Sequence, residues 1–108
     1  NFQIARNGWI ADYNDPCSFL DMWYTDGGNN DAQYSNPDYD AAIDAAKATS
    51  DPEERMKAFH EAEDILIGQD SVLAPIYFYT QPYMLNPDID GMYYTPLGYF
   101  FFGYTSKK

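Results

Sequence analysis

The stretch ARNGWIADYNDP, residues 5–16, sets the interpretation of the whole chain. Its first part continues an alternating pattern that predicts a β-strand over residues 2–10. Its last two residues, Asp15 and Pro16, are typical of a helix start, because aspartate caps unpaired N–H groups and proline supplies the φ of the first turn. The stretch therefore predicts a strand that leads into a short helix ending near residue 23.

Between these two elements lie groups that suit an extended guest molecule. Gly8 has no Cβ, so another backbone can approach it closely. Trp9 offers a flat apolar wall with one N–H donor. Asp12 follows Ile10 by two residues, where the strand is expected to end. A carboxylate beside an exposed strand edge suits a peptide with a free amino terminus, although Asp12 as a turn cap and Trp9 as a core residue remain the plain alternatives.

The composition excludes several classes of partner. The 108 residues carry six basic and seventeen acidic side chains, a formal net charge of -11. This charge argues against nucleic acid and against an anionic membrane surface, since both attract basic faces. The single cysteine, Cys17, permits no disulfide within the chain and is expected to be a small buried side chain. Nothing resembles a signal peptide or a bilayer-spanning apolar run.

A helical hairpin is predicted in the middle of the chain. One helix begins at residues 36–37 and runs to about residue 49, and another begins at residues 51–52 and ends at Gly68. His60 is expected at the surface. The predicted buried face comprises Tyr39, Ala42, Ile43, Ala46, Ala58, Phe59, Ala62, Ile65 and Leu66.

The segment before the hairpin, residues 25–36, is rich in turn-forming residues and is predicted to be a loop. Its aspartates and asparagines resemble a calcium loop only faintly. The D-x-[DN]-x-[DN]-G spacing is not kept, and no glutamate follows at the distance that bidentate binding needs. We therefore predict a tight turn, with no metal and no other cofactor.

The last third of the chain is dominated by aromatic side chains. Residues 71–80 are predicted to form a buried strand, with Pro75 near its start or at a sheet edge. The runs 92–94 and 99–104 are aromatic without alternation, so they need cover on both faces. Without that cover they form a sticky patch, and we expect the isolated chain to self-associate or to swap domains.

Taken together, these motifs resemble a known family. The pattern A-R-x-G-W-x-A-D-Y-x-(D/E)-P-x-S-F-L over residues 5–20 is similar to the signature near the C-terminal end of the family 5 extracellular solute-binding proteins. These are the oligopeptide- and dipeptide-binding components of ABC importers. The resemblance continues, in the family's order, through Asn29, Asn30, Tyr34, Pro37, Tyr39, Asp40, Ala62, Glu63 and residues 74–79.

The resemblance implies a fold, a location and partners. The fold is α/β, the C-terminal portion of a two-lobed periplasmic-binding-protein-like (class II) fold, with a helical hairpin plus strands. Residues 1–79 would belong to the second lobe, and residues 80–108 would return to the first lobe. The protein would be extracytoplasmic, in the periplasm or at the cell surface, with any lipid anchor at an N-terminus far upstream. Its partners would be a peptide ligand and the membrane permease of the importer.

The resemblance also implies roles for individual residues. Asp12 takes the place of the family's ammonium-binding aspartate. Residues 8–10 would pair with the main chain of the peptide, and Trp9 would form the wall of a side-chain pocket. Arg6 would meet a ligand carboxylate or a neighbouring acidic side chain. Tyr79 would donate a hydrogen bond to the peptide backbone.

Two other functions fit the composition less well. A glycosidase needs two carboxylates at a fixed separation, but most of the glutamates fall on one predicted helix, where they would be solvated. No nucleophile–base pattern, metal-ligand cluster or phosphate-binding loop is evident, so we predict that the protein is not an enzyme. The stronger alternative is a carbohydrate-binding module that uses some of the eleven tyrosines as stacking platforms.

Overall fold

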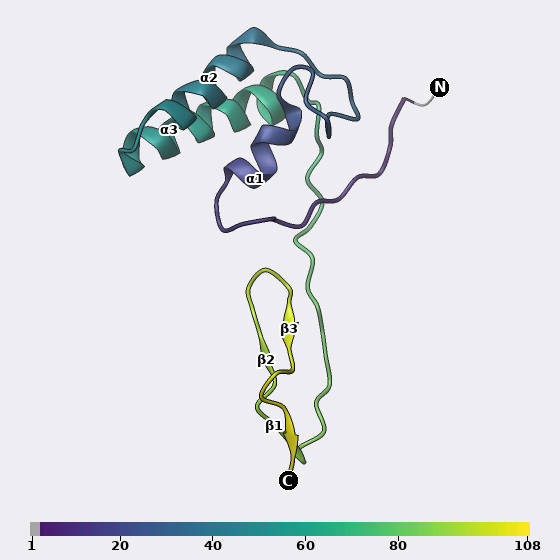
Figure 1. Cartoon of the computed structure of the whole chain (residues 1–108). Coiled ribbons are helices and arrows are strands. Elements are labelled where there is room, and N and C mark those ends of the chain that lie inside the picture. The colour runs from purple at the N-terminus through teal and green to yellow at the C-terminus, as the bar shows by residue number, and fades with distance from the viewer. Residues whose placement is uncertain (1–2) are drawn as a thin grey trace. The chain divides into compact units, whose positions relative to one another are not determined.

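The computed structural model describes residues 3–108, and the chain divides into two compact units at the Pro75–Ile76 junction (Figure 1). The helical elements of the first unit are α1 (Cys17–Leu20), the 3-10 helix η1 (Asp21–Trp23), α2 (Pro37–Ala48), α3 (Pro52–Glu63) and the π-helix η2 (Asp64–Gln69). The strands of the second unit are β1 (Ile89–Asp90), β2 (Tyr93–Tyr94), β3 (Phe100–Phe101) and β4 (Ser106–Lys107).

The two long helices begin where their capping residues predict. The Asn36 side chain accepts a hydrogen bond from the backbone N–H of Asp38 at 2.9 Å. The Asp51 carboxylate accepts from the N–H groups of Glu53 and Glu54 at 2.9 and 3.0 Å. A proline follows each cap at the first helical position. These local contacts confirm the hairpin of α2 and α3.

The core of the first unit lies between α2, α3 and the short α1–η1 segment. Every residue of the predicted hairpin face is buried, and Tyr39, Ile43, Phe59 and Leu66 are buried almost completely. Cys17 and Trp23 join the same cluster from α1 and η1. His60 is exposed, as expected. The helical period is therefore a sufficient guide to burial in this unit.

The end of the second long helix differs from the prediction. Gly68 does not terminate it, because the chain continues as the π-helix η2 to Gln69. The backbone reverses at Ser71, whose φ of +52° lies in the left-handed region. The N–H of Val72 then donates to the carbonyl of Leu66 at 2.9 Å, which closes the helix end.

Two predicted strands are wrong. Residues 3–10 and residues 71–80 form no strand; Phe2 lies outside the described residues. The side chains of Ile4 and Phe78 are 91% and 98% exposed. A strand requires a second strand to accept its backbone hydrogen bonds, and no described segment supplies one here. Alternating side chains predict the faces of a strand, but they do not provide its partner.

The second unit contains two short antiparallel pairs. β1 pairs with β4, and β2 pairs with β3 so that Tyr93 faces Phe101 and Tyr94 faces Phe100. Gly91 follows β1 with a φ of +80°, and a Cβ at this position would lie 2.0 Å from the carbonyl oxygen of Tyr104. The turn therefore requires glycine.

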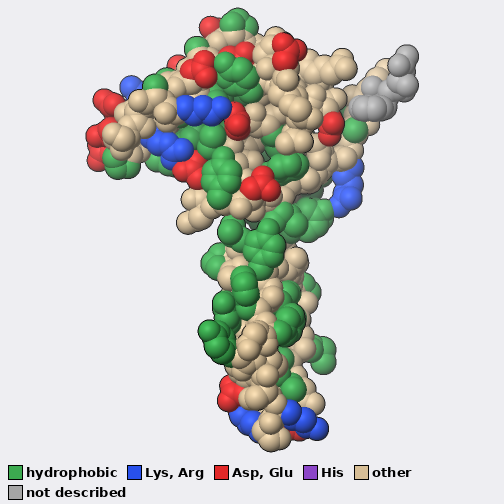
Figure 2. Space-filling model, in the orientation of Figure 1, with side chains coloured by type: hydrophobic (Ala, Val, Ile, Leu, Met, Phe, Trp, Pro, Cys, Tyr) green, Lys and Arg blue, Asp and Glu red, His purple; other side chains and the backbone are tan. Residues whose placement is uncertain are grey.

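Aromatic rings hold this second unit together without burying one another. The rings of Tyr93 and Phe101 are stacked 4.9 Å apart, and Tyr83 meets Phe100 edge-on at 5.2 Å. Even so, Phe101 is 43% exposed, and Figure 2 shows hydrophobic side chains on the visible face of this unit. The cover that these side chains need is not present among the described residues of the unit, and self-association stays a prediction.

Candidate ligand-binding site

Two of the predicted site residues line one hollow of the first unit. Trp9 is half-buried and packs against the helical core, and the Asp12 side chain is exposed. Both border an open hollow of about 340 Å³. The rest of its lining comes from the α1–η1 region, the following loop and α2: Tyr13, Cys17, Ser18, Asp21, Met22, Tyr24, Gly27, Gly28, Asn29 and Lys47.

The other predicted residues are placed differently. Arg6, Gly8 and Ile10 are exposed and do not line this hollow. The N–H of Gly8 donates to the side chain of the preceding Asn7 at 2.7 Å. Tyr79 belongs to the second unit, where its ring lies 4.9 Å from that of Tyr77. The structure thus brings together Trp9 and Asp12, while the roles of all six residues stay predictions.

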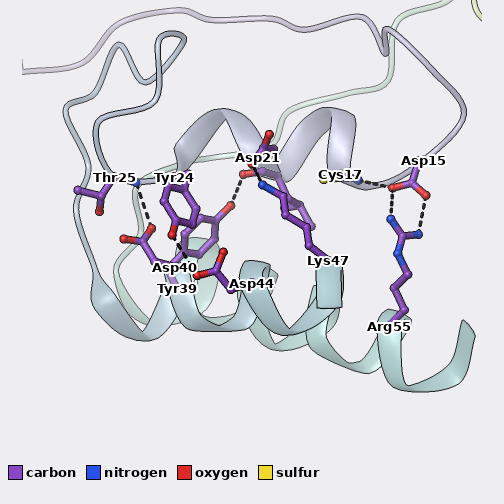
Figure 3. Close-up of polar contacts among 11 residues, drawn as sticks. Asp15, Cys17, Asp21, Tyr24, Thr25, Tyr39, Asp40, Asp44, Lys47 and Arg55 are labelled. Atoms are coloured by element: carbon purple, nitrogen blue, oxygen red, sulfur yellow. Dashed lines mark hydrogen bonds and ion pairs between the residues drawn. The ribbon is translucent and has the colours of Figure 1, made fainter. Parts of the chain in front are cut away.

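The backbone around Asp12 is fixed by the start of α1. The N–H of Asp12 donates to the buried Ser18 Oγ at 2.8 Å. Asp15 accepts from the N–H of Cys17 at 2.9 Å and pairs with both terminal nitrogens of Arg55 on α3, at 2.5 and 2.8 Å (Figure 3). The bond from Arg55 lowers the pKa of the Asp15 carboxyl, while partial burial opposes the shift. Asp12 therefore projects from an anchored turn.

Polar contacts also fasten the α1–η1 segment to α2 (Figure 3). The buried hydroxyl of Tyr39 donates to the carbonyl of Leu20 at 2.6 Å, and burial raises its pKa, so it remains a donor. Lys47 pairs with Asp21, and both side chains line the hollow. The carboxylates of Asp12 and Asp21 therefore share this surface with one ammonium, which favours a ligand that carries positive charge.

Asn30, which the sequence predicts only as a turn residue, organises the loop beside the hollow. Its side chain is buried, and its Nδ2 donates to the carbonyls of Tyr24 and Tyr34 at 3.1 and 2.7 Å. Its Oδ1 accepts from the N–H of Tyr34 at 2.9 Å. In the same loop, a Cβ on Gly27 would lie 2.9 Å from the carbonyl oxygen of Tyr24. Turn composition alone could not reveal this role for Asn30, because the partners lie four to six residues away.

The indole of Trp9 adds a buried donor to this hollow. The buried Nε1 of Trp9 has no hydrogen-bond partner among the described residues. No group of three or more His, Cys, Asp or Glu side chains within residues 3–108 is arranged to hold a metal. In the same part of the chain, no helix is both long enough and apolar enough to cross a bilayer. With a carboxylate and an indole wall on one open hollow, this surface is a candidate ligand-binding site.

Comparisons with known proteins identify the class of binding protein. No family model matches the chain. The chain is 40% identical over 90 residues to the periplasmic oligopeptide-binding protein OppA of Haemophilus influenzae, a match that covers 83% of this chain and 16% of that protein. It is 35% identical over 98 residues to the dipeptide-binding protein DppE of Bacillus subtilis, covering 91% of this chain and 18% of that protein.

A comparison with solved structures points to the same class of protein as these relatives. The crystal structure of a peptide-binding protein of a peptide ABC transporter superposes with a TM-score of 0.55 at 37% identity, over 60% of this chain and 30% of that one. The chain belongs to the family 5 extracellular solute-binding proteins and corresponds to a part of one. It spans 16% and 18% of the two named relatives, and its mixed helix and strand content is that of a portion of their two-lobed fold.

Proposed function

We propose that this chain forms part of the ligand-binding surface in the substrate-binding component of an ABC importer, and that the ligand is an oligopeptide. The observation that carries the proposal is the placement of Trp9 and Asp12 on one hollow, with the backbone of Asp12 held by Ser18. The names of the relatives support the ligand class, since they are oligopeptide- and dipeptide-binding proteins.

Asp12 captures the α-ammonium of the peptide in this proposal. Its side chain is exposed and projects from a turn that α1 and Arg55 anchor, so little ordering is needed when a cation arrives. In a closed and water-poor cleft, removal of one partner from such a pair costs about 2–5 kcal/mol. The segment at residues 8–10, where Gly8 and Ile10 are exposed, supplies main-chain groups, which every peptide can match regardless of its sequence.

The remaining parts complete the proposed mechanism. Arg6 meets an acidic group of the ligand or of the protein, and Tyr79 donates to the peptide backbone. Residues 1–79 belong to the second lobe and residues 80–108 return to the first, so that the peptide is enclosed when the lobes close. The closed form is then recognised by a membrane permease. The protein acts outside the cytoplasm and catalyses no reaction, which its similarity to the periplasmic oligopeptide-binding protein OppA of Haemophilus influenzae supports.

A chimera tests the proposal directly. The matched 90 residues of the Haemophilus influenzae relative are replaced by those of this chain, and binding of a tripeptide is measured by calorimetry. We expect Asp12→Ala to weaken binding of the free tripeptide by roughly 30-fold or more, with much less effect on its N-acetylated form. Glu61→Ala, an exposed carboxylate on α3 outside the hollow, is the matched control and should leave binding unchanged.

Two results would contradict the proposal. One is equal binding of both peptides by the chimera and by its Asp12→Ala variant, with thermal melts showing that both are folded. The other is binding of oligosaccharides with indifference to N-acetylation, which the carbohydrate-binding alternative predicts. The 108-residue chain alone should bind the tripeptide hardly at all, because the proposed cleft needs both lobes, and micromolar affinity would count against that arrangement.

A further inference from the structure

A single carboxylate joins two segments of the first unit that are far apart in sequence. The hydroxyl of Tyr34 donates to Asp70 Oδ2 at 2.6 Å, and the side-chain amide of Asn36 donates to the same oxygen at 2.7 Å. Both bonds lower the pKa of the Asp70 carboxyl, so it is charged at neutral pH and accepts two charge-assisted bonds. Asp70 thereby connects the end of the 25–36 loop with the segment after η2.

On one side of this connection lies the wall of the hollow. Tyr34 exchanges two hydrogen bonds with the buried Asn30 side chain, at 2.7 and 2.9 Å. The N–H of Asn30 donates to the carbonyl of Gly27 at 3.0 Å. Residues 27–29 line the hollow that Trp9 and Asp12 also border. A displacement of this wall is therefore passed to Tyr34 through bonds that involve one buried side chain.

On the other side lies the segment that leads out of the first unit. The N–H of Asp70 donates to the carbonyl of Ile65, and the N–H of Val72 donates to that of Leu66, both at 2.9 Å. Between them Ser71 has a φ of +52°, a conformation that a serine keeps only when its neighbours hold it. From there the chain continues to Pro75, where the first unit ends. We call residues 71–75 the connecting segment.

We propose that Asp70 is a positioning residue that couples the wall of the hollow, residues 27–29, to the connecting segment. Because both segments share its Oδ2 as acceptor, a ligand that shifts the wall shifts the start of the connecting segment, and movement of that segment in turn shifts the wall. The link between the two segments stands on its own, and only its use by a ligand rests on the proposed function.

Amide hydrogen exchange in the 108-residue chain without ligand tests this coupling. Tyr34→Phe removes one bond from the loop side, and Asp70→Ala removes the acceptor. We expect Tyr34→Phe to speed exchange at Val72, and Asp70→Ala to speed it at Asn30, each by roughly threefold or more. At each of these amides, the double variant should exchange no faster than the faster of the two single variants. Asp70→Asn, whose Oδ1 can accept both bonds, should restore slow exchange.

The matched control is Tyr24→Phe. It removes another partly exposed tyrosine hydroxyl, one that donates to Asp44 at 3.1 Å, and should leave Val72 unchanged. The proposal is overturned when each variant affects only its own side, when the two effects add, or when Tyr24→Phe disturbs Val72 equally. If Asp70→Ala does not fold, the effect of Tyr34→Phe on exchange at Val72 tests the proposal by itself. Since no ligand is present, failure of the chimera to bind peptide would remove the proposed function without changing this result.

Discussion

The two units of this chain contain similar kinds of apolar residue but treat them in opposite ways. In the first unit, α2 and α3 enclose Tyr39 and Phe59, which are 0% and 1% exposed. In the second unit, Phe102 and Tyr104 are 63% and 83% exposed, although neighbouring rings stack. A helix satisfies its own backbone and needs only a second helix to cover one face, whereas a strand needs partners at its edges and over its faces. The first unit therefore covers the large apolar side chains of its core by itself, whereas the second unit leaves many of them exposed.

Removal of a buried aromatic ring should show the largest difference in stability effect between the two units. Phe59→Ala should lower the free energy of unfolding of the first unit by about 3–5 kcal/mol, because it loses apolar burial and leaves a cavity. Urea unfolding followed by tryptophan fluorescence measures this, since Trp9 and Trp23 both lie in the first unit. Phe101→Ala in the second unit should leave that transition almost unchanged. Equal effects of the two variants would remove the distinction.

A backbone substitution should affect only the second unit. Gly91→Ala places a Cβ against the carbonyl of Tyr104 at a φ of +80°, a strain of roughly 1–3 kcal/mol. Nuclear magnetic resonance should show loss of the β1–β4 pairing, while the tryptophan transition stays in place. Gly103→Ala is the control, because nothing lies within 4 Å of the added Cβ. A shifted tryptophan transition would show that the units are not independent.

A single buried hydroxyl should have a smaller effect on the first unit. Tyr39→Phe removes the donor to the carbonyl of Leu20 and should cost about 1 kcal/mol in the same urea experiment. Tyr24→Phe, whose hydroxyl bond to Asp44 is exposed, should cost almost nothing. If both variants cost the same, burial would not be the reason that Tyr39 matters.

The pH dependence of the Asp15–Arg55 pair should give the smallest difference. Because Arg55 lowers the pKa of Asp15 in the folded state, the pair contributes its full stability above the unfolded pKa of about 4 and loses it as the pH falls through the lowered folded value. Asp15→Asn should thus lower the thermal midpoint slightly near neutral pH and hardly at all near pH ~2. Glu63→Gln, which changes the exposed pair with His60, should show no such difference between the two pH values. The assignment would be contradicted if Asp15→Asn lowered the thermal midpoint more in acid than near neutral pH.

Sequence patterns predicted the helical unit well and the strands poorly. The caps Asn36 and Asp51 mark the true helix starts, and every residue of the predicted buried face is buried. The strands expected at residues 2–10 and 71–80 are not formed in the described residues, because alternation carries no information about a partner. Within the candidate site, Trp9 and Asp12 were named from the sequence, and the structure adds that they border one hollow.

The sequence by itself determined the positions of the helices and their buried faces, because each helix is specified by contacts within a few residues. Only the tertiary structure decided that Tyr34, Asn36 and Asp70 meet at one oxygen atom, across separations of 34 and 36 residues. It also decided that the described residues of the strand-like segments are mostly exposed and form no strand pairing. Both outcomes depend on groups distant in the chain, whose positions no local pattern encodes.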